Sequence, residues 1–310
     1  MNAWRDLADR GRLRTHVPLG PLTTYKLGGP ARLLVDVDDG ADLESLAAGL
    51  EETPLPVLVL GRGSNVLIAD GGFDGVVVRL TAGFAWVRWQ PGLVSAGGAT
   101  PLPQLARSAG KAGQGGLEFY VGIPGSVGGA VRMNAGCHGS ETAEVLKVAE
   151  VFDLCDGSRA ELSPAALELS YRHSNLADTD IVVAATYRTD PVDPDTAEET
   201  MREVSRWRRQ YQPGGTLNAG SVFKNPPGDA AGRIIDQCGL KGYSIGAVSV
   251  SEKHANFIVA EQKATAREVH DLVLSVQDLV RRRAGVDLVP EIRFVGDFGE
   301  IPGGSGAEDG

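Results

Sequence analysis

The 310-residue sequence has no apolar run that approaches the roughly 18 residues needed to cross a membrane, so no transmembrane segment is expected. Residues 1–14 carry charges throughout and lack an apolar core, which argues against a secretory signal peptide. Basic residues are outnumbered by acidic ones, and the net charge of −10 argues against an extended basic surface that would bind nucleic acid. We therefore expect a cytoplasmic protein without a membrane span.

Cysteine and histidine are scarce, with three and five residues in the whole chain. Cys137, Cys155 and Cys238 form no C-x-x-C pair, so we interpret them as free thiols in a reducing compartment. His138 follows Cys137, but neither H-E-x-x-H nor another metal-ligand spacing occurs. A metal site is therefore not expected.

Glycine, in contrast, is abundant: the 41 glycines are about twice the usual share. Two loops are rich in it, GRGSN at 61–65 and GIPGSVGGAVRMNAG at 122–136, and the first follows an apolar run at 55–60. Exposed backbone N–H groups in such loops form a cradle for anions. Two loops of this kind indicate a ligand with a diphosphate, held from two sides.

Neither loop matches a familiar nucleotide motif. The first lacks the third glycine of a dinucleotide fingerprint, because position 66 is Val, and no Gly-Lys-Ser/Thr of a Walker loop follows. On the residues alone, an ordinary strand-end turn explains the first loop equally well. Tight packing is the alternative for the second loop.

Hydrophobic periodicity predicts the regular elements. Strands are expected at 31–37, 55–60, 76–80, 85–89, 93–97, 148–154 and 181–188, and helices at 41–50 and 101–112. After a Pro- and Asp-rich linker at 190–195, Thr196 and Glu199 predict a capping box for a helix whose apolar face holds Met201, Val204, Trp207 and Tyr211. A last helix is expected to begin with a capping box at Thr265 and Glu268 and to end at Gly285.

Three segments carry candidate chemistry. Ser221 lies among small residues and near a cation in NAGSVFKNP at 218–226, although an ST turn is the alternative. Glu291 and Arg293 are predicted on one face of a strand, either as functional charges or as an edge-strand ion pair. Arg172 suits a planar carboxylate, although a solvated surface arginine is commoner. The G-x-S-x-G elbow of a hydrolase is absent.

Seven segments together resemble the UDP-N-acetylenolpyruvoylglucosamine reductase family, also called UDP-N-acetylmuramate dehydrogenases. They are TYKLGG at 24–29, LGRGSNVLIAD at 60–70, GIPGSVGGAVRMNAG at 122–136, SYRHS at 170–174, NAGSVFKNP at 218–226, IIDQCGLKG at 234–242 and VPEIRFVG at 289–296. They occur in family order, and the set is far more specific than any one segment.

The resemblance implies an α+β fold: a two-subdomain FAD-binding unit of the vanillyl-alcohol oxidase type and a C-terminal α+β substrate domain. The expected boundaries are 1–80 and 81–195 for the FAD-binding subdomains and 196–302 for the substrate domain. The tail at 303–310 is expected to be disordered, because it has almost no apolar residues.

The resemblance also implies an oxidoreductase of cell-wall precursor synthesis with non-covalent FAD and with NADPH and a UDP-sugar as substrates. A monomer is expected. The implied catalytic residues are Ser221 as proton donor, with Arg172 and Glu291 beside the substrate carboxylate. The implied FAD-binding residues are Gly61, Arg62, Gly63, Ser64, Asn65, Gly122, Ile123, Pro124, Gly125, Gly128, Gly129, Asn134, Ile181 and Arg206. The implied substrate contacts are Tyr171, Arg209, Lys224, Asn225, Gln237 and Arg293.

The chain resembles the branch of the family without an extra substrate-covering loop, because the span from Arg172 to Ser221 is short. Two other functions stay open. A flavin oxidase of the same superfamily often carries FAD on His or Cys in the glycine loop, and 61–65 contains neither. A non-catalytic nucleotide-sugar or flavin-binding protein has no use for the proton donor that Ser221 implies.

Overall fold

The computed structural model describes residues 3–299, so the tail predicted at 303–310 lies outside the described residues. Within 3–299, no helix combines the length and the apolar character that a membrane crossing requires. The chain divides into two compact units. Of the described residues, unit 1 holds 3–17, 31–64 and 74–214, and unit 2 holds 18–30, 65–73 and 215–299.

The first half of unit 1 is a four-stranded sheet with strand order β1-β2-β5-β3. Its strands are β1 (Leu13–Pro18), β2 (Pro30–Val37), β3 (Val57–Val59) and β5 (Phe73–Leu80), with helices α1 (Ala3–Asp9) and α2 (Gly40–Glu52). Strands β3 and β5 pair in parallel. Helix α2 begins with a capping box of Asp39 and Asp42 and buries Leu43, Leu46 and Leu50 in the core of this half.

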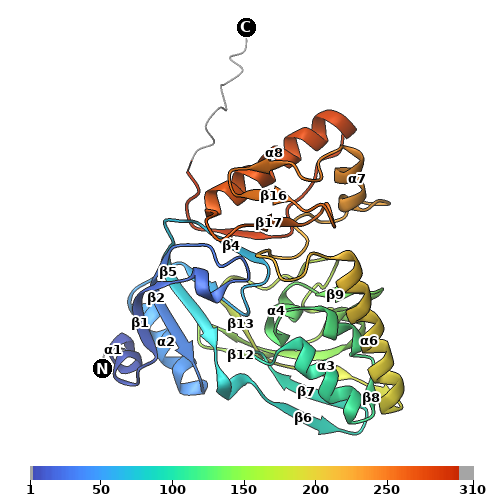
Figure 1. Ribbon diagram of the computed structural model, residues 1–310. Helices are drawn as coiled ribbons and strands as arrows, with labels where there is room; N and C mark the ends of the chain where they lie inside the picture. Colours follow the sequence, from blue (N-terminus) through green and yellow to red (C-terminus); the bar gives the residue numbers. More distant parts are fainter. Residues whose placement is uncertain (1–2, 300–310) are drawn as a thin grey trace. The chain divides into compact units, whose positions relative to one another are not determined.

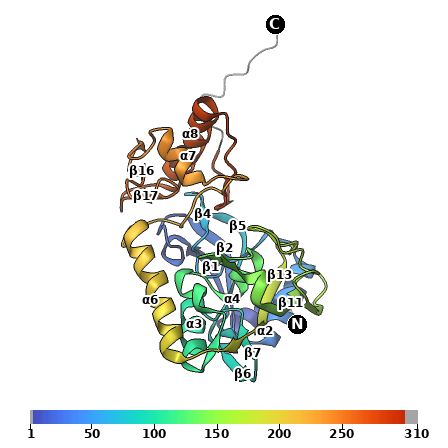
Figure 2. The same ribbon diagram turned by 90° about the vertical axis from the view of Figure 1, so that its right-hand side faces the viewer.

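The second half of unit 1 is an antiparallel sheet with order β12-β11-β13-β7-β6. Its strands are β6 (Val87–Gln90), β7 (Leu93–Gly97), β11 (Leu146–Asp153), β12 (Arg159–Leu162) and β13 (Asp180–Arg188). Helices α3 (Leu102–Lys111), α4 (Val127–Arg132) and α6 (Pro194–Tyr211) lie on the same side of this sheet (Figures 1 and 2). The strands and helices predicted here are confirmed to within a few residues.

Helix α6 differs from its prediction at its N-terminus. It begins two residues before Thr196, because Asp193 is the N-cap and Pro194 supplies the fixed φ of the first turn. The capping box predicted at Thr196 and Glu199 is therefore wrong, and part of the predicted linker is helical. Met201 and Val204 are buried as expected, whereas Trp207 and Tyr211 on the same stripe are exposed.

Unit 2 is built around the antiparallel sheet of β15 (Ser244–Ile245), β16 (Val248–Val250) and β17 (Ile258–Ala260). Helices α7 (Ala231–Gln237) and α8 (Ala266–Ala284) pack with this sheet in one hydrophobic core (Figure 2). The capping box of Thr265 and Glu268 is confirmed, and so is the end of α8 at Gly285, which has a φ of 68°. A separate parallel pair joins β4 (Val66–Ile68) to β18 (Arg293–Val295).

The chain enters unit 2 three times, which no local pattern indicated. Tyr25 is fully buried there, and its hydroxyl donates to the Ile258 carbonyl at 3.0 Å. Helix α6 belongs to unit 1, since Ala197, Met201 and Val204 join the core of its second half. The domain boundaries near 80 and 195 stay predictions.

Candidate functional site

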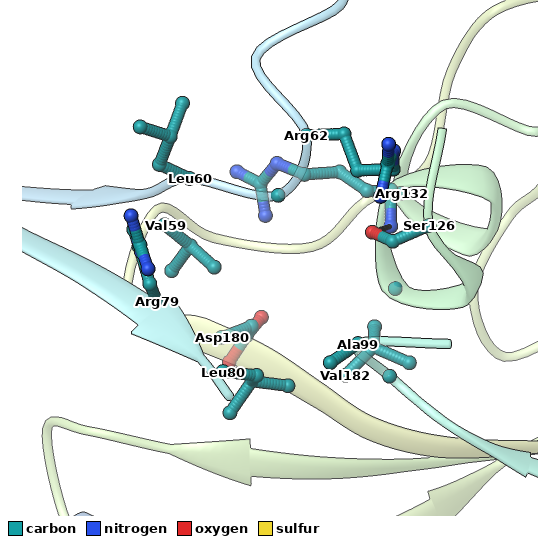
Figure 3. A pocket seen from close by; sticks show the side chains of 14 residues that line it. Val59, Leu60, Arg62, Arg79, Leu80, Ala99, Ser126, Arg132, Asp180 and Val182 are labelled. Atoms are coloured by element: carbon teal, nitrogen blue, oxygen red, sulfur yellow. Dashed lines mark hydrogen bonds between the residues drawn. The ribbon is translucent and has the colours of Figure 1, made fainter. Parts of the chain in front are cut away.

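Unit 1 contains a cavity of about 280 Å³ between the two glycine loops (Figure 3). The first loop follows β3, and the second contains the short helix α4, whose N-cap is Ser126. The cavity is lined by Val59, Leu60, Gly61, Arg62, Arg79, Leu80, Gly98, Ala99, Ser126, Gly128, Gly129, Arg132, Asp180 and Val182. Four of the predicted FAD-binding residues line this cavity: Gly61, Arg62, Gly128 and Gly129. A fifth, Ile181, lies between the lining residues Asp180 and Val182.

Glycines form the cavity wall because the backbone segments touch. A Cβ on Gly98 would lie 2.1 Å from the Val182 carbonyl oxygen, and a Cβ on Gly61 would lie 2.9 Å from Ser126 Oγ. Gly128 donates its N–H to the Gly98 carbonyl at 2.9 Å. Glycine is needed at Gly98 by the close approach of main chain and at Gly61 by the Ser126 side chain. Both interpretations of the loops, tight packing and a cradle for a ligand, therefore apply at the same place.

Four charged side chains line this cavity. Arg62 and Arg132 lie on the side of Ser126, across from Asp180, and Arg79 lies on β5 (Figure 3). Arg79 is fixed by Asp36, with Nε 3.1 Å from Oδ1. Arg132 donates to the Ala177 carbonyl and to Asp178. Three cations around a glycine-walled cavity fit a diphosphate such as that of FAD. Arg79, Arg132 and Asp180 were not identified from the sequence as residues of this cavity.

Ile181 itself is fully buried in the core of the first half of unit 1, because its side chain points away from those of Asp180 and Val182 along β13. Gly122, Ile123, Pro124 and Gly125 connect the turn η3 (Glu118–Gly122) to α4. Their part in FAD binding, like that of Gly63, Ser64 and Asn65, stays a prediction.

Arg172 lies in a strained two-residue turn. Ser170 and His173 exchange backbone hydrogen bonds across Tyr171 and Arg172, and Arg172 has a φ of 54°. That conformation normally belongs to Gly or Asn at this position of a turn, and such strain concentrates at functional sites. The guanidinium donates to the Gly136 carbonyl at 2.8 Å and to the Asn134 carbonyl at 3.4 Å.

Asn134 connects this turn to the second glycine loop. It is fully buried, with a φ of 39°. Its amide donates to the Ser170 carbonyl at 3.0 Å, and its side-chain oxygen accepts the Ala143 N–H at 2.8 Å. The glycine loop and the Arg172 turn are thus held together through a side chain that was predicted only as a cofactor contact.

Helix α6 presents a different arginine to the glycine loop from the one predicted. Arg206 is exposed and lies 3.6 Å from Glu199 on the same helix. Arg208 is partly buried, donates to the Gly122 carbonyl, and donates from Nε to Gln212 at 2.8 Å. Arg208 follows the buried Val204 by four residues, so the helical repeat could have identified it.

Cys137 and His138 lie beside this arginine. Burial raises the pKa of the Cys137 thiol to about 11, against the opposing effect of Arg208 and Arg172. Desolvation, and then Arg208, lower the pKa of His138. The Cys137 thiol and the His138 imidazole are therefore neutral at pH 7. Among residues 3–299, no cluster of acids, histidines and cysteines is arranged to hold a metal ion.

Unit 2 brings Ser221 and Glu291 together through backbone pairing. Glu291 donates its N–H to the Val222 carbonyl at 2.7 Å, and Lys224 donates its N–H to the Val289 carbonyl at 2.8 Å. Phe223 and Pro290 form an antiparallel bridge between the two segments. Glu291 precedes β18, so the prediction that it shares a strand face with Arg293 is wrong: Ile292 forms a bend between them.

Asn256 holds the Ser221 segment from the opposite side. Its side-chain oxygen accepts the Phe223 N–H at 2.9 Å, and its amide donates to the Phe223 carbonyl at 2.8 Å. Its own carbonyl accepts the Val222 N–H at 2.9 Å. Asn256 is only 4% exposed, so it completes the backbone hydrogen bonds of the residues after Ser221 where no strand is available. Sequence reasoning missed it.

The last residue of the first glycine loop takes part in this site. The Asn65 amide donates to the Glu291 carbonyl at 3.1 Å, and Arg293 donates its N–H to the Asn65 carbonyl. The parallel pairing of β18 with β4 produces this register. Asn65 therefore positions the backbone of Glu291 within unit 2.

The other predicted substrate contacts lie on both units. Lys224 and Asn225 follow Ser221, and the Asn225 side-chain oxygen accepts the Ala231 N–H at the start of α7. Gln237 is the exposed last residue of that helix. Tyr171 and Arg209 are exposed residues of unit 1, and the Arg172 guanidinium carbon lies 5.1 Å from the Tyr171 ring centre. All of these assignments stay predictions.

The glycine-walled cavity with its three arginines fits a diphosphate ligand, and comparison with known proteins places the chain in a flavin-binding class. A model described as an FAD binding domain matches residues 31–163. A second model, described as the C-terminal domain of UDP-N-acetylenolpyruvoylglucosamine reductase, matches residues 212–295.

Relatives and a solved structure then specify the family. UDP-N-acetylenolpyruvoylglucosamine reductase 2 of Symbiobacterium thermophilum is 45% identical over 291 residues, 94% of each chain. A reductase of the same name from Heliobacterium modesticaldum is 41% identical over 302 residues, 97% of this chain and 96% of that one. The crystal structure of the Thermus caldophilus enzyme matches with a TM-score of 0.80 and 37% identity, covering 92% of this chain and all of the other. The chain belongs to the UDP-N-acetylenolpyruvoylglucosamine reductase family.

Proposed function

We propose that this chain reduces the enolpyruvyl ether of UDP-N-acetylglucosamine to UDP-N-acetylmuramate, with NADPH as the reductant, in the synthesis of peptidoglycan precursors. Family membership along 94% of the chain carries this proposal. Bound FAD supplies the hydride chemistry of such a reaction. The glycine wall and the three arginines of the unit 1 cavity support binding of its diphosphate.

The proposal includes the short-loop branch of the family, a monomer and a cytoplasmic location. Strand β13 and helix α6 occupy most of the interval between Arg172 and Ser221, which leaves little length for an extra covering loop. For the FAD contact on α6 we propose Arg208 rather than Arg206, because Arg208 reaches the Gly122 carbonyl.

Ser221 is the proposed proton donor. Reduction of the enolpyruvyl double bond adds a hydride to the methylene carbon and a proton to the adjacent carbon, which passes through an enolate-like state. A serine hydroxyl is a weak acid and can protonate only such a basic carbon. The hydrogen bonds of Val222 and Phe223 with Asn256 support this role, because they fix the backbone directly after Ser221.

Arg172 is proposed to stabilise the negative charge that develops on the substrate carboxylate, and Glu291 is proposed to assist beside that carboxylate as a protonated acid that donates a hydrogen bond. Arg172 is held by the carbonyls of Asn134 and Gly136, which limits its movement. The backbone of Glu291 is held at its N–H by the Val222 carbonyl and at its carbonyl by the Asn65 amide. A cation fixed before the reaction, such as the Arg172 guanidinium, stabilises a developing negative charge without reorganisation.

The experiment that tests this function is an anaerobic visible spectrum of the flavin-loaded enzyme. NADPH should bleach the flavin band, and the enolpyruvyl substrate should restore it. Ser221→Ala should lower the rate at which the enolpyruvyl substrate reoxidises the flavin on the order of 10²–10⁴-fold. The rate of flavin reduction by NADPH should stay nearly unchanged. Reoxidation by oxygen alone would contradict the function, and equal losses in both half-reactions would contradict the role of Ser221.

A further inference from the structure

Unit 1 carries a cluster of aromatic rings for which the proposed mechanism gives no role. The ring centres of His138 and Trp207 are 4.9 Å apart, and those of Trp207 and Tyr211 are 5.2 Å apart. Trp207 is 42% exposed and Tyr211 45% exposed, and both are among the few large hydrophobic residues exposed within 3–299. We call these three residues the aromatic cluster.

Two elements hold the aromatic cluster in place. Trp207 and Tyr211 are four residues apart on α6, so their side chains are neighbours on one face of the helix. His138 occupies the tip of the two-residue hairpin between β9 (Gly136–Cys137) and β10 (Ser140–Glu141). His138 and Gly139 both have a positive φ, 54° and 83°, as a type I′ turn requires.

The surroundings of the cluster are cationic. Arg208 follows Trp207 on α6 and acts electrostatically on both Cys137 and His138. Arg172 binds the Gly136 carbonyl, two residues before His138, and lies over the ring of Tyr171. Arg209 is the next residue along α6. Exposed aromatic rings next to several arginines match a ligand that has both a flat heterocycle and phosphate groups.

We infer that the aromatic cluster of His138, Trp207 and Tyr211 is a stacking platform for the heterocycle of a nucleotide, whose phosphates are attracted by the cationic surroundings of the cluster. This inference rests on the proposed function, in which both NADPH and the UDP-sugar are nucleotides. Their shared chemistry, a heterocycle joined to a diphosphate, is what the platform recognises. The neutral imidazole of His138 is consistent with stacking on an uncharged ring.

Titration of flavin-loaded enzyme with UDP and, separately, with NADP⁺ tests the platform. Trp207→Ala should weaken at least one of the two about tenfold or more, because stacking on an aromatic side chain is lost. Trp207→Phe should restore most of the affinity. Trp89→Ala is the matched control, because Trp89 is 39% exposed on β6, and it should bind both nucleotides like the original chain.

A second variant covers the case in which Trp207→Ala fails to fold or loses its flavin. His138→Asn keeps a residue suited to the positive φ of the hairpin and removes the ring, so weaker nucleotide binding is expected without loss of stability. Loss for UDP alone would identify the uracil as the stacked ring, and loss for NADP⁺ alone would identify a ring of the dinucleotide. Unchanged affinities for both nucleotides in both variants would overturn the inference.

The titrations also separate the platform from the reaction. Binding of UDP and NADP⁺ needs no turnover. If the unaltered enzyme fails to reduce the enolpyruvyl substrate but Trp207→Ala still weakens nucleotide binding, the proposed function is wrong and the platform stands. If the unaltered enzyme turns over and the variants bind normally, the platform is wrong and the function stands.

Discussion

The two units build their candidate sites by different means. In unit 1, the cavity depends on missing side chains, because Gly98 and Gly128 let main-chain segments touch and Gly61 leaves room for the Ser126 hydroxyl. In unit 2, Ser221 and Glu291 depend on hydrogen bonds that set the register of two chain segments. A site built from absent side chains is sensitive to added atoms, whereas a site built on register is sensitive to lost hydrogen bonds. The predictions below test that contrast.

The largest effect is expected from adding one carbon in unit 1. Gly98→Ala would place a Cβ 2.1 Å from the Val182 carbonyl oxygen and 2.9 Å from Leu80, with no flexible side chain to relieve the first contact. We expect a loss of about 3 kcal/mol in the free energy of unfolding and loss of flavin from the purified protein. Thermal unfolding and the flavin-to-protein absorbance ratio measure both effects.

Gly214→Ala is the control for this substitution, because its Cβ would meet no atom within 4 Å. Its stability and flavin content should stay near those of the original chain. A Gly98→Ala protein that is stable and fully loaded would show that the cavity wall tolerates added atoms, and the contrast between the units would fail there.

The next effect is expected from removing hydrogen bonds in unit 2. Asn256→Ala leaves the buried Phe223 N–H and carbonyl without their side-chain partner, which costs about 2 kcal/mol in the free energy of unfolding. It also releases the backbone after Ser221, so the half-reaction with the enolpyruvyl substrate should slow by about tenfold or more. Stopped-flow flavin reduction by NADPH should remain close to normal.

Asn175→Ala offers a comparison, because the Asn175 amide also donates to a backbone carbonyl, that of Ala166, but at an exposed site in unit 1. Its effect on both half-reactions should be small. If Asn256→Ala slowed flavin reduction and substrate reduction by the same factor, its role would be general stability rather than positioning of Ser221.

The same contrast explains what the sequence could predict. Glycine clusters are a property of local composition, so the loops at 61–65 and 122–136 can be recognised from the residues alone. Helix α8 was predictable at both ends, since Thr265, Glu268 and Gly285 act locally. Ser221 and Glu291 stood out as chemical groups, but their pairing depends on contacts between segments about seventy residues apart.

Other features had no local signal. Asn256 acts on Phe223 from 33 residues away, and an isolated Asn in a sequence is typical of a turn. The predicted N-cap of α6 is wrong because Asp193 and Thr196 both suit that position, and Pro194 decides between them. The assignment of residues 18–30 and 65–73 to unit 2, ahead of the C-terminal segment, likewise depends on tertiary packing alone.

The smallest effect tests how helix α6 supports the glycine loop. Arg206 and Arg208 are two residues apart, which places them on nearly opposite faces of an α-helix. Only Arg208 continues the buried face of Met201 and Val204, and it donates to the Gly122 carbonyl. Arg208→Ala should weaken flavin binding by about tenfold, the cost of one charge-assisted hydrogen bond, in a titration of the flavin-free protein.

Arg206→Ala should have the smaller effect of the two, and Arg202→Ala, which removes an exposed partner of Glu198, sets the baseline. A larger loss in Arg206→Ala than in Arg208→Ala would return the flavin contact to Arg206, and would mean that the Gly122 carbonyl is held by the loop itself rather than by the helix.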